Sequence, residues 1–492
     1  MVEQSGVLVT FIVYLVLMIL IGWYFYKKTS SISYYILGGR SLNSWVASLS
    51  AQASDMSGWL LLGLPGLAYT TGLGSVWIAI GLGLGAYLNW KIIASRLRKY
   101  TQVAGNALTL PVYLQNRFKV KDHTIRVVSA IFILVFFLIY TASGFVAGAR
   151  LFNTVFDLSY HSALITGVLV IISYTFLGGF MAVSWTDFIQ GVIIFFAIIS
   201  IPLLVIGDQG SIDQTYLVLE QKSLFNIFNA GNGQSLTSIG IISLAAWGLG
   251  YFGQPHILVR FMAIKHSRQI PKARKIAIIW VVISLACAIL IGMTGNIIVE
   301  KSLRPPENET VFMLMVDILV NPWFTGIVLS AILAAIMSTA DSQLLVASSA
   351  MTEDLYRFIF RKNASQKELI WAGRISVVII AIIAFFIALN PESSVLDLVA
   401  YAWGGFGAAF GPLIILSLFW ERITYKGAIT GIIIGGLTVL IWKQLNGGIF
   451  ELYEIVPGFL FSLLSIIVVS LFDRAPNEEV LEEFRSIKTV NF

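Results

Sequence analysis

Apolar runs, each long enough to form a helix of about 20 residues, follow one another along almost the whole chain with short polar segments between them. Such a helix spans the ~30 Å hydrocarbon core of a bilayer. A content of 57% hydrophobic and 12% charged residues is too apolar for an ordinary soluble domain, and no stretch is left for a soluble catalytic domain. The sequence therefore predicts an all-α integral membrane protein in contact with the lipid bilayer.

We expect about 13 transmembrane helices, near residues 6–26, 43–70, 74–95, 126–155, 160–180, 185–207, 236–264, 274–299, 323–356, 368–390, 395–420, 426–446 and 452–472. With the amino terminus outside, most basic residues fall in inner segments, which include 91–126, 260–275 and 357–374. Because inner loops of membrane proteins are rich in Lys and Arg, this pattern predicts a cytoplasmic carboxyl terminus. The net charge of +6 is then an orientation signal, and it indicates no nucleic-acid partner.

The span near 43–70 contains an acid and several helix-weakening residues, Ser54, Asp55, Ser57 and Gly58. A carboxylate at the centre of a spanning helix costs about 2.5 to 3.5 kcal/mol, so a cation or polar group should offset it. Irregular backbone at this depth is tolerated where it lies inside protein, and transporters bind ions with it. The alternative is a small-residue packing face with an acid pointing into the bundle.

A second interruption lies at 247–255, where three glycines precede Pro255. Two broken spans, five spans apart, predict two inverted repeats, spans 2–6 (about 43–207) and spans 7–11 (about 236–420), with the binding site at the membrane midplane. The repeats would lie in a single transporter domain, residues 1–472, followed by a tail, 473–492. Two independently kinked helices are the alternative, since Gly and Pro are common in membrane helices.

Small and hydroxyl side chains form one stripe on the predicted helix 323–356, at Ala335, Ser338, Thr339 and Ser342. Two of these hydroxyls could complete an oxygen shell for sodium that begins with carbonyls freed at the first break. A packing seam, with hydroxyls bonded to their own helix, is the alternative. Asp341 favours function, because an acid in the same turn is hard to explain as packing.

Three aromatic residues lie near the two breaks in the sequence, Trp59, Trp247 and Tyr251, and we group with them Tyr140 of the span near 126–155. Indole and phenol groups give a small solute an apolar wall and polar contacts. The helix that begins after Gly58 would present free amide groups to a carboxylate of that solute.

Several longer motifs resemble those of the solute:sodium symporter family, over essentially the whole chain. They are 55–59, 174–187, 248–256 and 333–339, with additional matches at 37–40, 106–111 and 400–403. The resemblance implies a leucine-transporter-like core in spans 2–11. It also implies that the protein imports L-proline together with sodium across the bacterial cytoplasmic membrane.

The resemblance assigns the following residues. It implies sodium ligands from the backbone of Ala53, Met56 and Ala335 and from the hydroxyls of Ser338 and Thr339. It implies a substrate pocket made by Ser57, Gly58, Trp59, Tyr140, Trp247, Tyr251 and Pro255. Asp55 and Asp187 would be the acids needed for coupling.

Asp341 and Ser342 are open to two interpretations. In some relatives a second sodium lies one helical turn along, near the acid that matches Asp187, so a second cation or a proton is one hypothesis. The other is that Asp341 pairs with a basic residue at the inner mouth.

Sodium is the expected coupling ion, with no other cofactor and no obligatory protein partner. The sequence does not predict an enzyme, because its histidines are scattered and it contains no phosphate-binding GxxxxGK motif. The alternatives are a symporter for another amino acid or a betaine, and a membrane sensor built on a transporter core.

Overall fold

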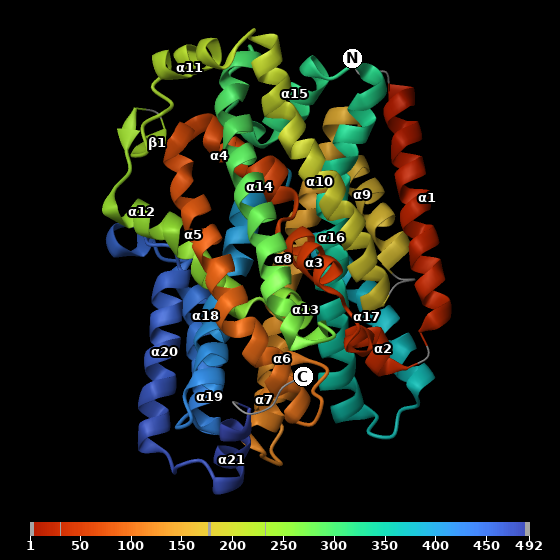
Figure 1. Ribbon diagram of the computed structural model, residues 1–492, viewed down its shortest axis with the longest axis vertical. Helices are drawn as coiled ribbons and strands as arrows, with labels where there is room; N and C mark the ends of the chain where they lie inside the picture. Colours follow the sequence, from red (N-terminus) through yellow and green to blue (C-terminus); the bar gives the residue numbers. More distant parts are fainter. Residues whose placement is uncertain (1–3, 30, 176–178, 232, 488–492) are drawn as a thin grey trace.

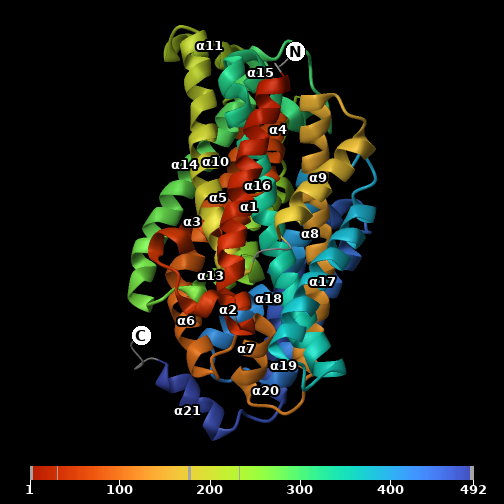
Figure 2. The same cartoon turned by 90° about the vertical axis from the view of Figure 1, so that its right-hand side faces the viewer.

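Long helices that run between the two ends of the molecule form most of the structure (Figure 1). The computed structural model describes residues 4–29, 31–175, 179–231 and 233–487. Positions 176–178 of the motif 174–187, and 488–492 of the predicted tail, lie outside the described residues. The amino-terminal helix starts at one end of the molecule, and the carboxyl-terminal helix lies at the other (Figures 1 and 2).

The helices in the first half of the described chain are α1 (Gln4–Lys28), α2 (Ile32–Leu37), α3 (Ser44–Asp55), α4 (Leu64–Thr71), α5 (Val76–Leu88), α6 (Ala94–Val103), α7 (Leu110–Phe118), α8 (Thr124–Phe156), α9 (Tyr160–Thr175), α10 (Phe180–Asp208) and α11 (Ile212–Gln221). Strands β1 (Asn229–Gly231) and β2 (Gln234–Ser235) then form an antiparallel pair.

The helices of the second half are α12 (Ser238–Ala245), α13 (Pro255–Ala263), α14 (Ile270–Ile298), α15 (Val311–Leu319), α16 (Pro322–Ser349), α17 (Gln366–Ile387), α18 (Val395–Phe419), α19 (Tyr425–Trp442), α20 (Ile455–Phe472) and α21 (Glu478–Ser486). A π-helical stretch, Ala350–Phe360, extends α16.

Within the described ranges, 10 helical segments are long and apolar enough to cross a membrane. The predicted spans near 43–70, 160–180 and 236–264 are instead occupied largely by shorter helices, since two of these spans are broken and α9 has 16 residues. The predicted helical membrane architecture is confirmed, with the short β1–β2 pair as an addition, whereas the number of 13 spans stays a prediction.

Both predicted interruptions are confirmed. The side chain of Asn43 caps the start of α3, and α3 ends at Asp55. Residues 56 and 57 are not helical, and the helix resumes at Gly58, continuing as a π-helical turn at Trp59–Gly63 that leads into α4. The second break is an eight-residue 3₁₀ segment, Ala246–Gly253, between α12 and α13. Serine and glycine weaken the first helix, and glycines with Pro255 end the second.

The broken segments lie inside the bundle. Helix α3 packs against α10, α13, α14 and α16, and α8 packs against both α16 and α18. Helix α3 is therefore enclosed by other helices, and residues 56–58 that follow it are buried, so the irregular backbone lies away from lipid.

Candidate cation and substrate site

The carboxyl end of α3 supplies carbonyl groups that point away from their own helix. The last carbonyls of any helix have no intrahelical partner, so other groups must satisfy them. The Ala53 carbonyl accepts hydrogen bonds from Ser338 Oγ at 2.8 Å and Thr339 Oγ1 at 3.3 Å. The Asp55 carbonyl accepts bonds from Tyr140 Oη and Trp59 Nε1, both at 3.2 Å. This helix end thus joins the hydroxyl stripe of α16 to the aromatic side chains.

Four oxygen atoms from α3 and α16 gather in what we call the Ala53 cluster: the carbonyls of Ala53 and Ala335 and the hydroxyls of Ser338 and Thr339. Ser338 Oγ also lies 3.2 Å from the Ala335 carbonyl. All four residues are buried. Hard cations prefer oxygen ligands, so these four oxygen atoms are a suitable ligand set for one when the hydroxyl protons turn away from the carbonyls. The predicted ligand Met56 is also fully buried, at the break itself.

Asp55, two residues after Ala53 at the end of α3, has a fully buried carboxylate. Its Oδ2 accepts a hydrogen bond of 2.5 Å from Tyr251 Oη, whereas its Oδ1 has no hydrogen-bond partner among the described residues. The partial negative charge of a helix carboxyl end adds to the negative charge of an ionised side chain. Both favour a cation at this end of α3.

The aromatic side chains predicted for the substrate pocket come together from the two breaks and from α8. The rings of Trp59 and Trp247 lie 6.0 Å apart, and Tyr140 and Tyr251 both hydrogen-bond to Asp55. Ser57 and Gly58 are buried at the first break. A Cβ added at Gly58 would lie 2.9 Å from the Ala147 Cβ, so only glycine fits beside α8.

Pro255, the last predicted pocket residue, is the first residue of α13. It lines an apolar cavity with residues of α7, α8 and α16. The structure therefore places Pro255 at the second break. The cavity that it lines includes neither Trp59 nor Trp247 among its lining residues.

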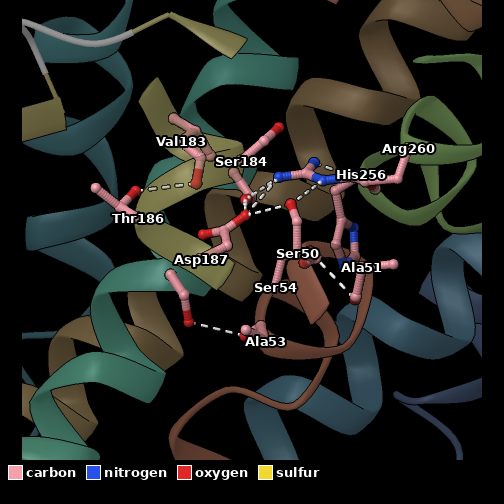
Figure 3. A network of polar contacts seen from close by, with 12 residues as sticks. Ser50, Ala51, Ala53, Ser54, Val183, Ser184, Thr186, Asp187, His256 and Arg260 are labelled. Carbon is pink, nitrogen blue, oxygen red and sulfur yellow. Dashed lines mark hydrogen bonds and ion pairs between the residues drawn. The ribbon is translucent and has the colours of Figure 1, made fainter. Parts of the chain in front are cut away.

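Asp187 lies in a separate polar group that includes a residue the sequence analysis missed. Oδ2 of Asp187 accepts hydrogen bonds from Ser50 at 2.7 Å and Arg260 at 3.0 Å (Figure 3). The same oxygen also accepts one from Ser342 at 3.4 Å. Asp341 is fully buried on α16, directly before Ser342. The structure thus brings Asp187 and Ser342 together, and both hypotheses for Asp341 stay open.

Arg260 corrects the sequence analysis, which counted it among the positive charges of an inner segment. The structure buries its side chain completely, in α13. The sequence could have indicated this burial, because Arg260 lies in the apolar run 255–263. A charge in such a run needs a partner, as the charge of Asp55 does. Trp403 was also missed as a site residue. Its Nε1 donates a 2.7 Å hydrogen bond to the Trp247 carbonyl in the second break.

Relatives with high identity cover almost the whole chain. The sodium/proline symporter of Escherichia coli (strain K12) is 51% identical over 486 residues, which is 98% of this chain and 96% of that protein. The sodium/proline symporter of Salmonella typhimurium is 50% identical with the same coverage. The high-affinity proline transporter PutP of Bacillus subtilis is 49% identical over 473 residues, 95% of this chain and 98% of its own.

Solved structures share the fold at low sequence identity. A Na⁺-coupled sialic acid symporter in a substrate-bound, outward-open state aligns with a TM-score of 0.80 at 18% identity and covers 96% of this chain and 99% of its own. MhsT in complex with L-phenylalanine aligns with a TM-score of 0.55 at 14% identity, covering 87% and 97%. The predicted leucine-transporter-like fold is therefore confirmed.

The model of the sodium:solute symporter family matches residues 35–435, a range that contains both breaks, the Ala53 cluster and Asp187. Together with the relatives above, this match shows that the chain belongs to the sodium:solute symporter family, whose members couple solute transport to sodium.

Proposed function

We propose that this protein imports L-proline together with sodium across the bacterial cytoplasmic membrane. The observation that carries the proposal is that one helix end serves two groups of side chains. The Ala53 carbonyl belongs to the oxygen cluster, and Asp55, two residues later, contacts Tyr140 and Tyr251. Sodium bound by the cluster would fix the end of α3, and with it the tyrosines that line the substrate pocket. The names of the relatives described above support proline as the solute.

One sodium ion supplies enough energy for this work. At a membrane potential of about −100 mV one charge contributes about 2.3 kcal/mol. A tenfold sodium gradient adds about 1.4 kcal/mol. The sum of about 3.7 kcal/mol corresponds to an accumulation of several hundredfold for a zwitterion such as proline.

The proposal includes the orientation and the repeats predicted above. We place the amino terminus outside and the carboxyl-terminal helix α21 in the cytoplasm, because basic residues are concentrated in the segments on that side. We assign the inverted repeats to about 43–207 and 236–420, each beginning with a broken span. Transport is the activity that we assign to the chain, without an enzymatic step.

Radiolabelled proline uptake into proteoliposomes tests the proposal. An inward sodium gradient should drive accumulation, and an equal potassium gradient should not. Unlabelled L-proline should compete, whereas other amino acids and glycine betaine at equal concentration should compete weakly. Stronger competition by one of those solutes would assign the protein to that substrate, and the absence of any sodium-driven uptake would contradict symport.

The hydroxyls of the Ala53 cluster give one testable prediction. Ser338→Ala and Thr339→Ala each remove an oxygen ligand, so each should raise the sodium concentration for half-maximal uptake about tenfold, the effect of losing about 1.4 kcal/mol. Proline affinity at saturating sodium should change less. Ser330→Ala is the matched control, since the Ser330 hydroxyl of the same helix bonds to its own backbone at 2.7 Å. Wild-type sodium curves for both variants would make the stripe a packing seam.

The indole pair gives a second prediction. Trp247 is 5% exposed, and Trp247→Ala removes apolar contact worth ~1.5 to 3 kcal/mol, so the Michaelis constant for proline should rise about 10- to 100-fold. Trp45→Ala is the control, because Trp45 is 52% exposed on α3. Uptake kinetics at saturating sodium provide the measurement. Unchanged proline kinetics in the Trp247 variant would place the pocket elsewhere.

A further inference from the structure

Arg260 and Asp187 form an ion pair whose two side chains are completely buried, with Nη2 3.0 Å from Oδ2. The arginine is held on several sides (Figure 3). Its Nε donates to Ser50 Oγ at 3.1 Å, its Nη1 donates to the His256 carbonyl at 2.8 Å, and its Nη2 also donates to Ser342 Oγ. Four helices, α3, α10, α13 and α16, therefore meet at one guanidinium group.

The groups around this guanidinium form a second oxygen cluster on the same two helices as the first. On α3, Ser50 lies three residues before Ala53, and on α16, Ser342 lies three residues after Thr339. Each pair is separated by about one helical turn, so α3 and α16 present two sets of oxygen atoms one turn apart. We call the group of Ser50, Asp187 and Ser342 the Asp187 cluster. A carboxylate with two hydroxyls is a suitable ligand set for a hard cation.

The two clusters differ in their charge balance. The Ala53 cluster contains carbonyls and hydroxyls and no fixed positive charge, whereas the carboxylate of the Asp187 cluster is neutralised by Arg260. A buried carboxylate without its partner is strongly destabilising, and removal of the arginine would leave this one beside two hydroxyls, a set of oxygen ligands that sodium can occupy. While the guanidinium is in place, it supplies the positive charge that sodium would bring.

We propose that Arg260 is a tethered cation that occupies the Asp187 cluster, so that only the Ala53 cluster takes up a mobile sodium ion. The chain then carries one sodium, and one positive charge, per substrate molecule. The inference rests on the proposed function as a sodium symporter. It makes Arg260 the residue that determines the coupling stoichiometry, which a purely structural ion pair would not do.

Counting bound sodium tests this inference without requiring transport. Radioactive sodium binding to the purified protein should give one ion per chain for the wild type and two for Arg260→Gln. Arg260→Lys keeps a positive charge and should give one. The double variant Asp187→Asn with Arg260→Gln removes both charges and should also give one.

A second ion pair provides a matched control. Arg126 Nε lies 2.6 Å from Oδ1 of Asp354, whose side chain is completely buried, and this pair lies outside both clusters. If any unpaired buried acid attracted sodium, Arg126→Gln would raise the count as well. We expect its count to stay at one.

Charge movement in proteoliposomes gives a second readout. The wild type should move one charge per proline with a sodium Hill coefficient of one, and Arg260→Gln should move two charges with a coefficient above one. An unchanged count and an unchanged charge ratio in Arg260→Gln would make Arg260 a structural residue. Two sodium ions per wild-type chain would also contradict the inference, even if Arg260→Gln failed to fold. A count of one sodium for the wild type and two for Arg260→Gln, without proline transport, would contradict proline as the substrate and leave the inference about Arg260 standing.

Discussion

Asp55→Asn should leave a folded, membrane-inserted protein whose uptake responds weakly to sodium. The substitution keeps the size of the side chain and removes its charge. Two unit charges about 5 Å apart, at an effective dielectric constant of about 20, attract each other by about 3 kcal/mol. Losing this attraction should raise the sodium concentration for half-maximal uptake on the order of 100-fold.

Two further variants make the Asp55 measurement specific. Asp55→Glu keeps the charge and should have a milder effect on the sodium curve. Asp317→Asn removes an exposed acid in α15 and should behave like the wild type. Normal sodium dependence in Asp55→Asn would exclude Asp55 from the coupling mechanism.

Gly85→Ala should abolish transport and lower the amount of folded protein. An added Cβ would lie 2.3 Å from the Gly248 carbonyl oxygen, which belongs to the second break. Backbone atoms on both sides cannot move aside as a flexible side chain can. Overpacking of this kind costs about 1 to 3 kcal/mol, and here it would also displace the segment that carries Trp247 and Tyr251.

Helix α5 offers a control for this prediction. Gly83 lies two residues from Gly85, and a Cβ added there meets no atom within 4 Å. Gly83→Ala should therefore retain both transport and thermal stability, measured by uptake and by the melting temperature of the purified protein. Equal behaviour of the two alanine variants would show that α5 and the second break are not in the tight contact described here.

The two breaks could be predicted because their cause is local. Serine, aspartate and glycine at 54–58, and glycines followed by Pro255, disfavour regular helix whatever their surroundings. The hydroxyl stripe could be predicted as well, because helical periodicity places Ser338 and Thr339 on the same face as Ala335 and Ser342. The contact of these hydroxyls with the Ala53 carbonyl is what the structure adds.

Partners that are distant in the sequence could not be predicted from one chain. Arg260 and Asp187 are 73 residues apart, and Trp403 is 156 residues from the Trp247 carbonyl that it contacts. Periodicity shows that a residue lies in a helix, but it does not show which helix packs opposite. For the same reason, the sequence alone indicates a charge of an inner segment at Arg260, where the structure has a buried ion pair.

The most direct test of the account is the linkage between sodium and proline binding in the purified protein. If one end of α3 serves both ligands, sodium should raise proline affinity, and proline should raise sodium affinity by the same factor, because binding linkage is reciprocal. Equilibrium binding of labelled proline at varied sodium, and of labelled sodium at varied proline, measures both factors. We predict equal factors of at least tenfold in the wild type and a factor near one in Asp55→Asn. Proline binding that is independent of sodium in the wild type would contradict the account.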